Sequence, residues 1–134
     1  MASIFTKIVN GEIPCFKIAE DSNYLAFLDI QPLAIGHALV IPKKEVDYLF
    51  DIDDELYVGL LLFAKKVAVA QKIAIPCKRV GVAVIGVEVP HAHIHLIPLN
   101  KISDINFSMP KLILSKEVME TTIHSILEAY KSLA

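Results

Sequence analysis

The chain has 134 residues, a length that suits one domain. Its net charge of −2 argues against a nucleic-acid partner, because a duplex-binding surface normally carries a basic patch. Hydrophobic residues make up 54% of the chain, yet no uninterrupted apolar stretch reaches the roughly 20 residues that a membrane-spanning helix needs. We therefore expect a core together with a substantial apolar interface, and a homodimer rather than a membrane partner.

The cysteines and the N-terminus bear on the cellular compartment. Cys15 and Cys77 form no CxxC or metal-ligand spacing, so we predict free thiols in a reducing compartment. The apolar stretches near the N-terminus are too short for a secretory signal peptide. The sequence therefore predicts a cytoplasmic protein.

The first part of the chain predicts a short helix followed by an antiparallel meander. Asp21, Ser22 and Asn23 form a turn signal between two strand-like runs, and Pro42 ends a third such run. The expected elements are a helix or turn over 3–9 and strands over 16–20, 24–29 and 37–41.

The middle of the chain predicts one long helix. The aspartates between 51 and 54 supply N-cap candidates, and a stretch rich in Leu, Ala and Lys runs to Ala74. Its apolar face is too wide for a narrow stripe, which indicates cover by the sheet and room for a second subunit. Residues 79–89 are strand-like, and an apolar stripe predicts a last helix from about Ser115 to Tyr130.

Three of the five histidines lie within residues 91–95, which read His-Ala-His-Ile-His. In an extended strand alternate side chains share a face, so His91, His93 and His95 are predicted to form one row. The intervening Ala92 and Ile94 then face the core. His124, beside the stripe of the last helix, is interpreted as an ordinary surface histidine.

The spacing of the row limits its chemistry. Neighbouring members lie about 6.7 Å apart at Cα, and zinc needs nitrogens at about 2.0–2.1 Å, so collecting all three on one ion would bend the strand sharply. Two of them with outside help remain able to bind a metal, and that alternative stays open. The pattern favours a central imidazole that attacks an electrophile while its neighbours bind or exchange protons with the same group.

The run His91-Ala-His-Ile-His-Leu-Ile resembles the HφHφHφφ signature of the histidine triad superfamily, where φ is hydrophobic. Residues 3–44 are similar to the N-terminal half of the histidine-triad nucleotide-binding branch, and the similarity resumes over 86–99. The resemblance implies a single domain over 1–134 with an α+β fold. This fold has an antiparallel sheet of about five strands, one long helix and a C-terminal helix. It also implies a homodimer joined through the long helix and a strand edge.

The resemblance implies a purine-nucleotide substrate that is cleaved at the α-phosphorus, as a phosphoramidate or ester of a nucleoside monophosphate. His93 would be the nucleophile and would form a nucleotidyl-histidine intermediate, without a metal or cofactor. His95 and His37 would contact phosphate oxygens or support the triad, and His91 would orient His93.

The same resemblance implies the nucleoside contacts. Asp29 would hold the ribose hydroxyls, and Ile30, Phe27 and Ile13 would line the base and sugar pocket. From the residues alone, a turn-capping carboxylate is an equally good interpretation of Asp29.

The chain departs from the family pattern just before the triad. The branch usually has Gly-Gln-Ser or Gly-Gln-Thr there, whereas this chain has Gly-Val-Glu-Val-Pro over 86–90, and residues 82–85 lack the usual asparagine. Glu88 would repel phosphate when ionised, or act as an acid for the leaving group if burial kept it protonated. Two further alternatives therefore stay open: a dinucleoside polyphosphate hydrolase, and a nucleotide-binding regulatory protein with weak or no catalysis.

Overall fold

The computed structural model describes residues 2–133, in which one five-stranded antiparallel sheet carries the helices. The strand order is β1-β2-β3-β5-β4, so β5 lies between β3 and β4 although it comes last in the chain. The predicted α+β fold with five strands is confirmed. The strands are β1 (Lys17–Glu20), β2 (Tyr24–Leu28), β3 (Ala38–Pro42), β4 (Arg79–Ala83) and β5 (Ile94–Leu99).

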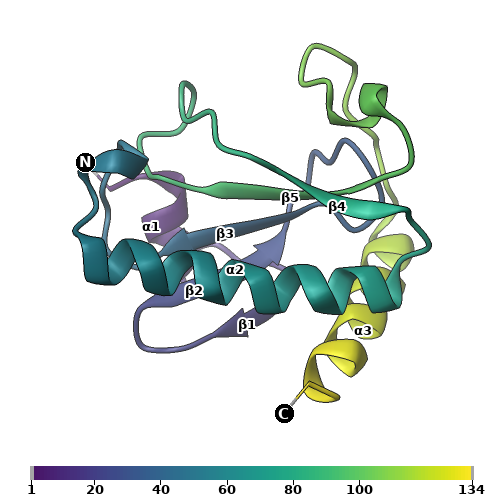
Figure 1. Cartoon of the computed structure of the whole chain (residues 1–134), viewed down its shortest axis with the longest axis horizontal. Helices are drawn as coiled ribbons and strands as arrows, with labels where there is room; N and C mark the ends of the chain where they lie inside the picture. Colours follow the sequence, from purple (N-terminus) through teal and green to yellow (C-terminus); the bar gives the residue numbers. More distant parts are fainter. Residues whose placement is uncertain (1, 134) are drawn as a thin grey trace.

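Three α-helices accompany the sheet, and each begins at a polar cap. The side chains of Ser3, Asp53 and Ser115 each accept a hydrogen bond from the backbone amide three residues on. The long α2 covers one face of the sheet and contacts β2, β3, β4 and β5, and α3 lies near β1 (Figure 1). Among residues 2–133, no helix combines the length and apolar character that crossing a bilayer demands. The helices are α1 (Ile4–Val9), α2 (Asp54–Ala74) and α3 (Lys116–Lys131), with 3₁₀ turns η1 (Leu49–Asp51) and η2 (Ile102–Ile105).

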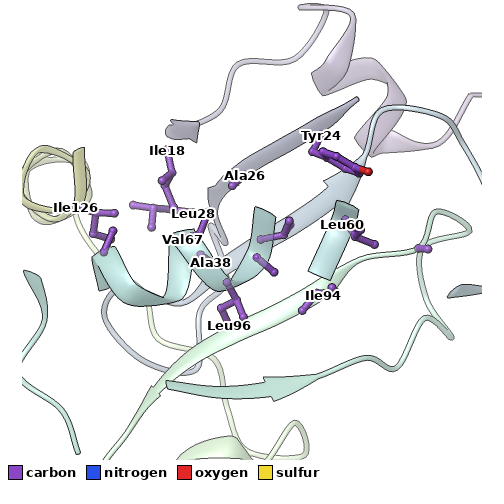
Figure 2. Close-up of a cluster of buried hydrophobic side chains, with 14 of the residues drawn as sticks. Ile18, Tyr24, Ala26, Leu28, Ala38, Leu60, Val67, Ile94, Leu96 and Ile126 are labelled. Carbon is purple, nitrogen blue, oxygen red and sulfur yellow. The ribbon is translucent and has the colours of Figure 1, made fainter. Parts of the chain in front are cut away.

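The main core lies between one face of the sheet and the helices α2 and α3. Alternation along β2 directs Ala26 and Leu28 into this layer. Figure 2 shows Val67 of α2 and Ile126 of α3 meeting the sheet residues there. The predicted burial of the residues between the histidines is confirmed, because Ala92, Ile94 and Leu96 belong to this same core.

The opposite face of the sheet carries a smaller cluster under α1. Phe5 of α1 packs on Leu25 and Phe27 of β2 and on Leu39 and Ile41 of β3. His95 is directly opposite Leu39 in the β3–β5 register, so its side chain lies on this second face. His95 therefore shares a face with α1, away from the main core.

A buried glutamine holds the segment that leads into β3. Gln71 of α2 is fully buried, and its Nε2 donates to the carbonyl oxygens of Gly36 at 2.8 Å and Leu96 at 3.0 Å. Gly36 has φ of +90°, and a Cβ there would lie 2.9 Å from Cγ1 of Ile75. These contacts hold the residue that follows, His37, beside β5.

The predicted strand over 79–89 is too long, since β4 ends at Ala83. Gly86 has φ of +70°, outside the strand region, and Pro90 has no N–H for a ladder. Residues 84–90 therefore form an irregular connection, and most of their side chains are exposed.

The prediction that His91, His93 and His95 all lie on one strand is also wrong. Strand β5 begins at Ile94, so only His95 is within it. The neighbouring β3 ends at Pro42, which offers no amide donor, and its carbonyl oxygen instead accepts a hydrogen bond from the His91 ring. The ladder stops there for this reason, and His91 and His93 precede the strand.

Candidate active site

Four histidines gather on the second face of the sheet. The ring centroids of His93 and His95 are 4.9 Å apart, and those of His95 and His37 are 5.2 Å apart. His91 lies behind His93, and Phe5 contacts both rings edge-on. All four side chains are buried, with exposed fractions between 0% and 8%. The predicted set is thus brought together, although not as a continuous row.

Backbone groups determine which nitrogen of His95 carries a proton. The amide of Leu33 donates to Nδ1 of His37 at 3.0 Å, so the neutral His37 ring carries its proton on Nε2. That Nε2–H donates to Nδ1 of His95 at 3.0 Å. His95 must then carry its own proton on Nε2, where it is free to donate to a bound group.

The opposite tautomer follows for His93. Its Nδ1 lies 2.7 Å from the carbonyl oxygen of His91, and a carbonyl oxygen only accepts, so Nδ1 carries the proton. The lone pair of a neutral His93 is consequently on Nε2. Neighbouring rings therefore present a nucleophilic nitrogen and a hydrogen-bond donor, the combination that a group-transfer site needs.

Burial keeps the supporting imidazoles neutral. Desolvation, with help from the nearby His95 and Lys111, lowers the pKa of His37 to about 3. Desolvation, with help from His93 and Lys111, lowers the pKa of His95 to about 4. Desolvation also lowers the pKa of His91 from its ordinary value. His37 and His95 therefore keep the tautomers derived above at neutral pH.

Asp29 sits at the end of β2, beside the histidines. One carboxylate oxygen accepts from the amide of Gln31 at 2.8 Å, and the other lies 3.6 Å from Nε2 of His37. Burial is the main cause that raises the pKa of Asp29. Both interpretations of this residue remain compatible with the geometry, because the turn-capping oxygen leaves its partner oxygen available to a ligand.

The three predicted pocket-lining residues differ in accessibility. Ile30 is 72% exposed, whereas Phe27 is 3% exposed within the cluster under α1. Ile13 is half-buried. Ile30 and Ile13 therefore have exposed surface that a ligand could contact, whereas Phe27 has very little.

A cavity of about 370 Å³ adjoins His93 on the side of the irregular connection. Its lining is mainly apolar and comes from two loops. Glu88 is exposed and does not line this cavity, so the burial that would keep it protonated is not found. The lining residues are Asp47, Tyr48, Leu49, Phe50, Val84, Ile85, Gly86, Val87, Ala92 and His93.

Sequence reasoning missed the segment that follows β5. Phe107 lies edge-on to His95, with ring centroids 4.7 Å apart, and also reaches His37 at 6.3 Å. Lys111 donates to the carbonyl oxygen of Phe107 at 2.9 Å and brings a positive charge to the site. Neither residue belongs to a local motif, so no signal in the sequence indicated them.

The residues that could hold a metal ion differ from the two triad histidines that the sequence indicated. Asp29, His37 and His95 have possible ligand atoms within 4.8 Å of one another, and only one of them belongs to the 91–95 run. Nε2 of His37 and Nδ1 of His95 already share a hydrogen bond. An ion bound at either of these nitrogens would break that hydrogen bond.

Comparison with known proteins agrees with this architecture. The family model described as HIT domain matches residues 10–102. The adenosine 5'-monophosphoramidase HNT1 of Saccharomyces cerevisiae is 45% identical over 98 residues, which cover 72% of this chain and 62% of the yeast protein. The chain thus spans less than two thirds of that relative.

Solved structures extend the similarity to nearly the whole chain. A Hit-like protein of Bartonella henselae has a TM-score of 0.83 at 33% identity and covers 95% of both chains. A zinc-bound histidine triad family protein of Mycobacterium smegmatis has a TM-score of 0.83 at 27% identity, over 99% of this chain and 96% of the other. Family match, relative and shared fold lead to one conclusion: the chain belongs to the histidine triad (HIT) family.

Proposed function

We propose that this protein is a nucleoside phosphoramidase that hydrolyses phosphoramidates or esters of nucleoside monophosphates at the α-phosphorus. The observation that carries the proposal is the pair of opposite tautomers. His93 offers a lone pair on Nε2, and the adjacent His95 offers a proton on Nε2. The name of the yeast relative, an adenosine 5'-monophosphoramidase, supports the same chemistry.

The reaction proceeds in two displacements at phosphorus. The Nε2 lone pair of His93 forms a bond to the α-phosphorus, and the bond from phosphorus to the leaving nitrogen or oxygen breaks. The leaving atom keeps that electron pair and takes up a proton from solvent. Water then attacks phosphorus and releases a proton to solvent, the P–Nε2 bond breaks, and the electron pair returns to the imidazole.

The other residues bind the substrate and stabilise charge. His95 Nε2–H donates to a non-bridging phosphate oxygen, an interaction of a few kcal/mol when it strengthens in the transition state. The free oxygen of Asp29 accepts from a ribose hydroxyl, and Ile13 and Ile30 contact the base and sugar. No step in this scheme needs a metal ion.

A labelling experiment tests the proposal. The protein is mixed with adenosine phosphoramidate labelled at phosphorus, quenched in base, digested, and mapped by mass spectrometry, with and without a chelator. We expect label on His93 and the same turnover in both buffers. Tight AMP binding without label would instead favour the regulatory alternative. Loss of turnover on chelation would favour the metal alternative.

Glu88 provides a prediction about the leaving group. The resemblance to the nucleotide-binding branch implies a hydroxyl or amide where this chain has the exposed carboxylate of Glu88. We therefore expect Glu88→Gln and Glu88→Ser to raise turnover of anionic leaving groups by a few-fold, about 1 kcal/mol or less for an exposed charge. Steady-state kinetics with an amine and a polyphosphate leaving group would measure this. Unchanged kinetics of both variants on both substrates would remove Glu88 from the mechanism.

The homodimer is also part of this proposal, and two exposed apolar features support it. Residues of α2 form an exposed stripe at helical spacing, and β4 is an edge strand with an exposed valine. An unpaired edge next to an apolar helix face suits two-fold pairing with an identical copy. The exposed residues are Val58, Leu61, Leu62, Val69 and Ile73 on α2 and Val82 on β4.

Charge placed on these features is expected to separate the subunits. We predict that the double variant Leu62→Glu and Val82→Lys runs as a monomer by light scattering, while the wild-type protein runs as a dimer. Ile113 is fully exposed outside both features, so Ile113→Lys is a matched control that leaves the dimer intact. A monomeric wild-type protein would contradict the dimer without affecting the chemistry proposed at His93.

A further inference from the structure

A hydrogen-bonded cluster joins the start of α1 to the histidines. The Ser3 hydroxyl lies 2.9 Å from Nδ1 of His91, and Thr6 Oγ1 lies 3.4 Å from the same nitrogen. Glu45, on the loop after β3, accepts from the backbone amide of Ser3 at 2.6 Å and from the Thr6 hydroxyl at 2.7 Å. These contacts join segments 39 to 88 residues apart in the chain.

The direction of each hydrogen bond follows from its acceptor. His91 Nε2 lies 2.7 Å from the Pro42 carbonyl oxygen, so it carries the proton of the neutral ring. Nδ1 of His91 is then an acceptor, and the Ser3 hydroxyl donates to it. Ser3 Oγ in turn accepts from the amide of Thr6, as the N-cap of α1. One buried hydroxyl thus caps the helix and holds the His91 ring.

The position of His91 affects His93 through the backbone of His91. Its carbonyl oxygen accepts from Nδ1 of His93 at 2.7 Å, the contact that leaves the lone pair on Nε2. Phe5, on the first turn of α1, packs edge-on against both rings, at 5.9 Å from His91 and 5.0 Å from His93. The position of α1 therefore determines where His93 Nε2 points.

We propose that Ser3 is a positioning residue for the reaction at His93, and that Glu45 holds α1 in the place where Ser3 can act. The inference rests on the proposed function for its catalytic consequence. The effect of Ser3 on the tautomers of His91 and His93 does not depend on the proposed function. Neither Ser3 nor Glu45 touches the reacting atoms.

The Glu45 carboxylate is suited to holding the start of α1 in place. The hydrogen bonds from Ser3 and Thr6 lower the pKa of Glu45 to about 2, so the carboxylate stays ionised across the working range of pH. It accepts from two donors of one helical turn at the same oxygen. Since Glu45 is exposed, its removal leaves no cavity and the variant is expected to fold.

Two matched controls separate positioning from general stability. Ser115 caps α3 in the same way, by accepting from the amide of Val118, but it is exposed, and no hydrogen bond within residues 2–133 joins it to the histidines. Glu20 is likewise an exposed carboxylate with two partners, Lys17 and Lys43. Ser115→Ala and Glu20→Ala therefore remove equivalent local contacts without touching the α1 cluster.

The experiment measures kinetics and imidazole ¹⁵N spectra on the full chain. We expect Ser3→Ala to lower kcat about 10- to 100-fold, because a small misplacement of a reacting group has that effect, with KM nearly unchanged. Ser3→Thr, which keeps the hydroxyl, should restore most of the rate. Glu45→Ala should lower kcat less, and both controls should retain it.

The ¹⁵N spectra show directly which ring nitrogen of each histidine carries the proton. In Ser3→Ala the His91 Nδ1 resonance should shift and His93 should lose its single-tautomer pattern, whereas both controls should match the wild-type protein. Unchanged spectra with unchanged kcat in Ser3→Ala and Glu45→Ala, or an equal loss of kcat in Ser115→Ala, would overturn the proposal. A wild-type protein without turnover would refute the proposed function alone, and the spectra would still decide the role of Ser3.

Discussion

Replacing His93 with alanine is expected to lower kcat by at least about 10⁴-fold, as removal of a catalytic nucleophile does in other covalent mechanisms. The reason is that no other ring of the site has a free lone pair facing the substrate. Nδ1 of His95 accepts from His37, and Nδ1 of His91 accepts from Ser3. Stopped-flow and steady-state turnover of an adenosine phosphoramidate, with base-quenched labelling, measure the effect.

The control for this variant is the remaining histidine of the chain. His124 is exposed on α3, so His124→Ala should keep the wild-type rate and the label. The His93→Ala protein should still bind AMP in a calorimeter, because Asp29 and His95 are intact. A His93→Ala protein that turns over within tenfold of the wild-type rate would refute nucleophilic catalysis at this position.

Acid is expected to lower the free energy of unfolding between pH 6 and 4.5, because buried histidines are neutral in the folded protein. His37 and His95 are neutral in the folded state, with pKa values lowered to about 3 and about 4, but titrate near 6.5 once unfolded. Below that value the unfolded chain binds more protons, so the free energy of unfolding falls as pH falls. Each such group costs about 1.4 kcal/mol per pH unit once the unfolded ring is fully protonated. The two together cost roughly 3 to 4 kcal/mol between pH 6 and 4.5, because the unfolded rings are already partly protonated at pH 6.

Urea unfolding at pH 7.5, 6.0 and 4.5 measures this dependence. Asp29 acts in the opposite direction because burial raises its pKa, and Glu45 and Asp104, with lowered pKa values, weaken the fold only at still lower pH. The histidines therefore dominate the window from pH 6 to 4.5. His37→Gln should reduce the slope in this window by about one proton. An unfolding free energy that stays constant from pH 7.5 to 4.5 would contradict the buried neutral histidines.

The local elements could be predicted from the sequence because their signals are local. The caps at Ser3, Asp53 and Ser115 act within one helical turn, and the predicted helices begin where these caps lie. The extent of the strands was harder to predict. The start of β5 depends on Pro42, a residue of the neighbouring strand, so the pattern around the histidines could not reveal it.

The contacts of the site depend on which strands become neighbours. His37 and His95 are 58 residues apart and meet only because β5 inserts between β3 and β4. Family resemblance suggested that both belong to the site, but not the tautomers, which backbone groups at Leu33 and His91 fix. Phe107 and Lys111 reach the histidines from the segment after β5, and Glu45 bonds the start of α1 from the loop after β3; no local spacing in the sequence indicates these contacts.

The irregular connection between β4 and β5 differs from the rest of the site in how freely its sequence can change. His95 stands in the central ladder, whose amides should exchange with solvent only when the whole sheet opens, whereas Val84, Ile85 and Val87 lie outside it and are exposed. A Cβ added at Gly86 would meet no atom within 4 Å, although its positive φ would be strained. Sequence changes in this stretch can therefore alter the cavity beside His93 without weakening the sheet, so the shape of the cavity and the stability of the fold can evolve separately.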